Sequence, residues 1–186
     1  LPYSVLLALL QAVGSWLFVR ALSVRWKNPY GQTLLYLLLL FSPISLTQLV
    51  TQRLYRMAIV PGMVLVVFSG MIGLTLRKEL PLKKQLPWAV LTGVALAFFW
   101  QIREDSVWIL PFIAVMTVWN VGYVILALHK NRTGRQLLLQ CLMLLLPILL
   151  LFGGNMTISA INQVHYGVFL TNDRTEGNFA ELMSLF

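Results

Sequence analysis

A short polar turn between two long apolar stretches carries the residues best suited to chemistry. It reads Arg103-Glu104-Asp105. A carboxylate beside a substrate hydroxyl can act as a general base, and a neighbouring guanidinium can stabilise negative charge that develops on a phosphate. A structural role is the alternative, because Asp105 or Ser106 at the start of a helix would accept a hydrogen bond from a free backbone N–H. The turn is therefore predicted either to cap a helix or to form part of a functional site.

Two arginines, Arg53 and Arg56, lie in the preceding connection, within Thr51-Gln52-Arg53-Leu54-Tyr55-Arg56. Their spacing of three places both on one face if this stretch is helical. Guanidinium groups bind phosphate oxygens through pairs of parallel hydrogen bonds. The arginines are predicted to contact phosphate at the membrane surface, either on a lipid-linked substrate or on ordinary phospholipid.

Further polar residues follow the last apolar stretch. His165 and Asp173 are expected to reach the same site, although an interfacial role without chemistry is the favoured interpretation of His165. Asn178 with Glu181 three residues later resembles a capping box. It predicts an amphipathic helix in the outer membrane interface or at the start of an extracytoplasmic domain, with Phe179, Leu182, Met183 and Phe186 on its apolar face.

The composition shows what must position these groups. Of the 186 residues, 59% are hydrophobic and 11% are charged. Soluble domains have roughly 45–50% apolar and about 25% charged residues, and a chain of this size cannot bury such an excess. The excess must face lipid, and the predicted fold is an all-α, polytopic transmembrane helical bundle.

Six stretches approach the length of about 20 mostly apolar residues that a membrane-spanning helix needs. The sixth continues without charge beyond one crossing, and we expect it to leave the bilayer near Gly153-Gly154. Residues 1–160 are predicted to form the membrane domain, and residues 161–186 an extracytoplasmic segment. The predicted spans are 3–22, 32–50, 57–76, 85–102, 106–128 and 136–156.

The basic residues fall unevenly on alternate connections. Ten lie on one set of loops and four on the other, and the richer set should face the cytoplasm. Both ends of the chain and five of its six acidic residues are then predicted to be extracytoplasmic. We expect a multi-pass protein of a bacterial plasma membrane. The ten are Arg20, Arg25, Lys27, Arg77, Lys78, Lys83, Lys84, Lys130, Arg132 and Arg135.

Several classes of function are disfavoured by what the sequence lacks. The net charge of +8 sits in short clusters, which do not build the continuous basic face that nucleic acid requires. No phosphate-cradling glycine loop, nucleophile elbow or His/Cys metal motif is present, so the cofactor is unknown and a divalent metal is not indicated. Mid-span ionisable residues are essentially absent, which disfavours ion-coupled transport. Because the chain starts at Leu1, we expect a portion of a longer protein.

Several segments together resemble uncharacterised bacterial multi-span proteins that are similar to GT-C-type glycosyltransferases. The resemblance implies sugar transfer from a polyprenyl-phosphate donor at the outer face, with an acidic residue near the bilayer as base. In well-known members this acid lies in the first outer loop, whereas that loop carries arginines here and the acids follow in the next. The segments are Phe41-Ser42-Pro43-Ile44-Ser45, Leu54-Tyr55-Arg56, residues 98–111 and His165-Tyr166-Gly167-Val168-Phe169.

Applied to this chain, the resemblance makes Asp105 or Glu104 the base that takes the proton of an acceptor hydroxyl. Arg103, Arg53 and Arg56 would stabilise the leaving phosphate. Two alternatives stay open. One is a non-catalytic, lipid-handling protein of flippase-like type that uses the same arginines for lipid phosphate. The other is a structural membrane subunit whose outer C-terminal segment docks a protein partner.

Overall fold

The computed structural model describes residues 2–43, 56–102, 106–128 and 133–171, and every regular element in this part is helical. The predicted all-α fold is therefore confirmed. The helices are α1 (Pro2–Leu22), α2 (Pro29–Leu40), α4 (Val60–Leu76), α5 (Leu82–Ile102), α6 (Leu110–Leu128) and α7 (Gly134–Tyr166), and the short 3-10 helices η1 (Arg56–Ile59) and η2 (Ser106–Ile109) precede α4 and α6.

Four of these helical stretches are long and apolar enough to cross a membrane: Tyr3–Leu22, Leu82–Ile102, Ser106–Ala127 and Gly134–Tyr166. The apolar helix α4 has 17 residues and is preceded directly by η1. The 12 residues of α2 begin the predicted second span, of which residues 44–50 lie outside the described part. The six described helices thus correspond in order to the six predicted stretches, and the chain is a multi-pass membrane protein.

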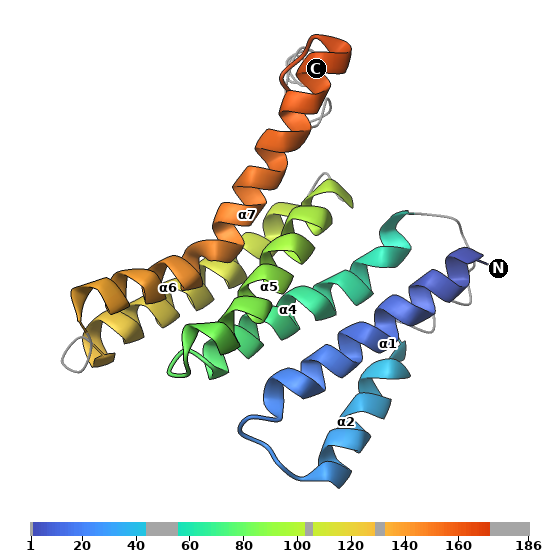
Figure 1. Cartoon of the computed structure of the whole chain (residues 1–186). Coiled ribbons are helices and arrows are strands. Elements are labelled where there is room, and N and C mark those ends of the chain that lie inside the picture. The colour runs from blue at the N-terminus through green and yellow to red at the C-terminus, as the bar shows by residue number, and fades with distance from the viewer. Residues whose placement is uncertain (1, 44–55, 103–105, 129–132, 172–186) are drawn as a thin grey trace.

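Helices that follow one another along the chain run in opposite directions, so the packed neighbours α1 and α4 run parallel to each other, as do α5 and α7 (Figure 1). Helix α4 lies between α1 and α5, α1 also contacts α2, and α7 covers α5 and α6 (Figure 1). The connections α1–α2, α4–α5 and α6–α7 therefore meet at one end of the bundle. Eight described lysines and arginines lie there, so we call it the basic end: Arg20, Arg25, Lys27, Arg77, Lys78, Lys83, Lys84 and Arg135.

Glycines let α4 approach its neighbours closely. A Cβ atom on Gly73 would lie 2.1 Å from Cε3 of Trp88 in α5, and one on Gly62 would lie 2.8 Å from Cγ of Leu10 in α1. Apolar side chains gain little by leaving lipid for each other, so such close contact between small residues is what holds membrane helices together. Helix α4 is consequently held close to α1 near its N-terminus and close to α5 near its C-terminus.

Helix α7 is longer than a membrane crossing requires. Its 33 residues span about 50 Å at about 1.5 Å per residue, whereas the hydrocarbon core is about 30 Å thick. The helix passes through Gly153-Gly154, where the chain is expected to leave the bilayer, continues to Tyr166 and ends at Gly167, whose φ of 71° suits glycine. The N-terminal part of the predicted extracytoplasmic segment is therefore helical, while residues 172–186 lie outside the described part.

The end of α7 extends past the helices it packs against (Figure 1). Near the C-terminus of α5, Nε2 of Gln101 donates to Oδ1 of Asn155 at 2.8 Å. Beyond that point the chain turns back on α7, since Nδ2 of Asn162 donates to the carbonyl of Leu170 at 2.7 Å. This projecting end lies opposite the basic end.

A basic pocket as the candidate functional site

Most of the predicted outer site lies outside the described residues. Arg53, Arg103, Glu104, Asp105 and Asp173 are not among them, and Arg56 is described only as the first residue of η1. His165 is exposed near the C-terminus of α7. The convergence of these residues on one outer site therefore stays a prediction.

The two residues that flank the acidic turn are described, and both are buried. Ile102 ends α5 and Ser106 begins η2. The hydroxyl of Ser106 donates to the carbonyl of Phe99, 3.3 Å away in the last turn of α5. The chain therefore leaves α5 and enters η2 at neighbouring points at the end of the bundle opposite the basic end.

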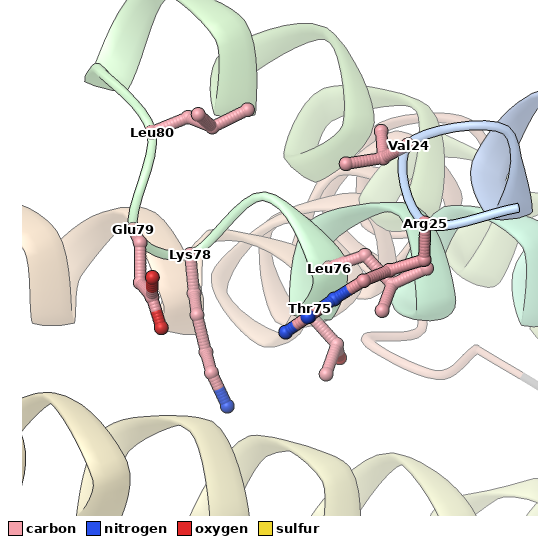
Figure 2. A pocket seen from close by; sticks show the side chains of 7 residues that line it. All are labelled: Val24, Arg25, Thr75, Leu76, Lys78, Glu79 and Leu80. Carbon is pink, nitrogen blue, oxygen red and sulfur yellow. The ribbon is translucent and has the colours of Figure 1, made fainter. Parts of the chain in front are cut away.

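The described residues gather chemically useful groups at the basic end, around a pocket of about 380 Å³. Two cations, one carboxylate and one hydroxyl share its walls with three aliphatic side chains, so the lining has a formal charge of +1. Figure 2 shows Lys78 and Glu79 extending in the same direction and Arg25 reaching toward Thr75. The lining residues are Val24, Arg25, Thr75, Leu76, Lys78, Glu79 and Leu80.

Arg77 joins the two segments that supply these walls. Its Nη1 donates to the carbonyls of Ala21 at 3.2 Å and Gly73 at 3.1 Å, and its Nη2 donates to the carbonyl of Arg20 at 3.1 Å. These carbonyls lie in the last turns of α1 and α4, where helices leave acceptors unpaired and favour positive charge. The guanidinium also lies 4.3 Å from the ring centroid of Trp88. Arg77 thus fixes the end of α1 against the end of α4.

Two fully buried glutamines hold the loop that follows α4. Both side-chain amides donate to the carbonyl of Lys78, from Gln140 at 2.8 Å and from Gln85 at 3.3 Å. Gln85 also donates to the carbonyl of Leu80 at 2.6 Å, and Gln140 donates to Oε1 of Gln85 at 2.6 Å. Because these bonds compensate the cost of burying polar groups, the loop backbone is fixed. Its fixed backbone sets the direction in which Lys78 and Glu79 leave the chain.

Helix α6 meets the same loop from its other side. The hydroxyl of Tyr123 donates to Oε1 of Glu79 at 2.6 Å. Nζ of Lys78 lies 3.8 Å from the centroid of the Tyr123 ring, a cation–π contact. Deeper in the bundle, Nδ2 of Asn120 donates to Oγ1 of Thr75 at 2.8 Å. The position of α6 is therefore tied to three residues that line the pocket.

The electrostatics of the pocket favour an anion. Desolvation is the main cause that lowers the pKa of Lys78; Glu79 raises this pKa and Arg25 lowers it. An anion between Lys78 and Arg25 would relieve the repulsion between the two cations. A guanidinium forms paired hydrogen bonds to phosphate and an ammonium binds it as a point charge. Within the described ranges, no group of three or more His, Cys, Asp or Glu residues is placed to hold a metal ion.

In the sequence these basic residues indicate only the topology, and their clustering around a pocket is not apparent. The available signal was the presence of polar residues in otherwise apolar helices, namely Gln85, Gln140, Asn120 and Tyr123. Such residues need partners inside the bundle, and the α4–α5 loop supplies them. Comparison of the chain with models of protein families, with curated proteins and with solved structures gave no match, so its function is inferred from its own residues.

Proposed function

We propose that this chain is a lipid-handling membrane protein that binds a phosphate-bearing membrane lipid in the basic pocket. The observation that carries the proposal is that Arg25 and Lys78 line one pocket at the end of an apolar helix bundle. The pair offers a forked donor and a point charge, a combination suited to phosphate oxygens. The proposal keeps the lipid-handling alternative but places the phosphate at the basic end instead of at the outer arginines Arg53, Arg56 and Arg103.

The depth of the pocket supports a lipid as the source of the phosphate. The apolar helices α1 and α4 end at Leu22 and Leu76, and the two cations follow within three residues of those ends. Where apolar helices end, the hydrocarbon gives way to head groups. By the positive-inside rule the basic end would face the cytoplasm of a bacterial plasma membrane, with both ends of the chain outside. Anionic lipids of that leaflet attract each lysine or arginine by about 1 kcal/mol.

The test measures binding of phosphatidylglycerol to the full chain in detergent by native mass spectrometry, with phosphatidylcholine as the uncharged comparison. Arg25→Gln and Lys78→Gln each remove a charge-assisted hydrogen bond, worth about 1.5–3 kcal/mol, and should weaken binding roughly 10- to 100-fold. Lys84→Gln is the matched control, because Lys84 is exposed at the same end and does not line the pocket. Equal weakening by all three variants, or equal binding of both lipids, would refute the proposal.

Sugar transfer from a polyprenyl-phosphate donor at the opposite end is a second proposal. It is supported by the residue content of the acidic turn and by the burial of the flanking Ile102 and Ser106, which ties this turn to the bundle. Glu104→Gln and Asp105→Asn should abolish transfer if these acids provide the base. If transfer survives both acid changes but is lost in Arg53→Gln, catalysis by these acids is wrong and only the lipid-binding interpretation stands. If every change is silent, the structural-subunit alternative gains.

A further inference from the structure

One side of α4, between its contact with α1 and its contact with α6, is only half covered. On one border α1 packs through Gly14, where the Cβ atom of Leu65 lies 3.0 Å from the position a glycine Cβ would take. On the other border, α6 packs through Phe112, whose ring centroid lies 4.3 Å from that of Phe68. Leu65 at the first border shares one face of the helix with Ile72 and Leu76, and all three are half-buried. We call these three residues the α4 stripe.

The α4 stripe is continuous with the basic pocket, because Leu76 belongs to both. Two further aliphatic residues, Val24 and Leu80, complete the apolar part of the pocket wall. A free phosphate ion would make no favourable contacts with these aliphatic side chains. A molecule with a charged head and a hydrocarbon tail would contact the cations with one part and the aliphatic walls with the other.

The dimensions agree with one leaflet of a membrane. From Leu76 back to Leu65, α4 rises about 16 Å at about 1.5 Å per residue, close to the roughly 15 Å of half a hydrocarbon core. Helices α1 and α6 each pack on α4 without extensive contact with one another in the described ranges. The stripe is therefore approached from the side, through the bilayer.

We propose that the ligand is a phospholipid that enters laterally between α1 and α6, with its phosphate between Arg25 and Lys78 and one hydrocarbon tail along the α4 stripe. This inference rests on the proposed function and adds the path of the tail and the direction of entry. Tyr123 holds the neighbouring Glu79 by a hydrogen bond, which offsets part of the carboxylate charge beside the phosphate. A free phosphate ion could make the same contacts inside the pocket. Only a lipid has a tail that lies along the α4 stripe, so the tail distinguishes the two ligands.

The experiment uses the full chain in phosphatidylcholine vesicles that contain a trace of phosphatidylglycerol with a photoreactive diazirine in one tail. After irradiation, mass spectrometry locates the labelled residues. We expect label to concentrate on the α4 stripe and on the facing sides of α1 and α6, and to fall roughly 10-fold in Lys78→Gln but not in Lys84→Gln. A phosphatidylcholine probe with the same tail should give only the diffuse background of annular lipid.

A second variant blocks the path of the tail and leaves the residues that bind the phosphate unchanged. Ile72→Trp should lower the concentrated label several-fold, whereas Val118→Trp, on a side of α6 where Val118 is 71% exposed, should leave it unchanged. Label spread evenly over all lipid-facing helices, and indifferent to Lys78→Gln, would overturn the lateral path. Glycerol phosphate that binds the pocket in detergent as tightly as the lipid would also overturn it, in favour of a soluble phosphate.

The lipid-phosphate site and the path of the tail can be refuted separately. If phosphatidylglycerol binding depends on Arg25 and Lys78 while the tail label lies elsewhere, the path of the tail is wrong and the lipid-phosphate site stands. If binding ignores both cations, the proposed function is wrong and the inference falls with it. Thermal unfolding of each variant shows whether a loss of label reflects a loss of fold.

Discussion

Arg77 is 8% exposed and its guanidinium joins two helix ends, so its removal should be costly. Arg77→Met removes three hydrogen bonds to backbone carbonyls and the stacking on Trp88. Hydrogen bonds that involve a charged group contribute about 1.5–3 kcal/mol each and cation–π stacking about 0.5–2 kcal/mol. The lower values add to about 5 kcal/mol. Because carbonyls at a helix end can turn toward water and recover part of this, we expect a loss of about 3–5 kcal/mol. At roughly 2–4 °C per kcal/mol for a chain of this length, the Tm should fall by roughly 6–20 °C.

The assay uses the single cysteine of the chain. Cys141 is half-buried in α7, and a thiol-reactive fluorogenic dye reports its exposure as the full chain unfolds in detergent. Arg77→Lys should lose an intermediate amount, because an ammonium keeps the charge but cannot stack and bridge as a planar group does. Lys84→Met is the control for a cation lost at the same end. A Tm for Arg77→Met within about 2 °C of that control would refute the bridging role.

Three further outcomes are expected. Gly73→Ala should lower stability by about 1–3 kcal/mol through overpacking, because its Cβ would meet a tryptophan ring at 2.1 Å; Gly153→Ala, with nothing within 4 Å, should be neutral or stabilising by up to about 1 kcal/mol in the same melting assay. Gln140→Leu should cost about 1–3 kcal/mol, because it leaves Oε1 of Gln85 unpaired, and the double replacement with Gln85→Leu should cost less than the sum in a double-mutant cycle. Affinity for phosphatidylglycerol should fall as the pH rises through the pKa of Lys78, which desolvation lowers, so the fall begins below the usual lysine value of about 10.4. Lys78→Arg should abolish this fall, since arginine stays charged, and a pH-independent wild type would contradict the role of Lys78.

The helices could be predicted because each apolar stretch has few physical alternatives. In lipid every backbone N–H and C=O must be paired within the chain, and a long uncharged segment achieves this as a helix. The same reason explains why α7 continues as a helix through Gly153-Gly154. Glycine weakens helices in water, where the backbone can bond to solvent instead, but it loses that effect where solvent is absent. The uncharged run from Gln136 to Asn172 already exceeded one crossing, and the structure extends α7 through most of it.

The basic pocket could not be predicted because its order comes from partners distant in sequence. Gln140 bonds to the carbonyl of Lys78, 62 positions earlier, and Arg77 bonds to that of Arg20, 57 positions earlier. A linear pattern shows that a buried glutamine needs a partner but not which carbonyl supplies it. Eight of the ten basic residues assigned to one side lie together at the basic end, since helix direction alternates along the chain, while Lys130 and Arg132 lie outside the described residues. That the loops at this end also close around a pocket follows only from how the helices pack.

The most direct test of the central claim, that the basic pocket holds a lipid phosphate, is an experimental structure of the full chain determined in lipid that contains phosphatidylglycerol. We expect a phosphate peak between Arg25 and Lys78, about 2.7–2.9 Å from their nitrogens, with tail density beside Ile72. A phosphate bound elsewhere, with the pocket closed by the side chains of Arg25 and Glu79, would contradict the claim.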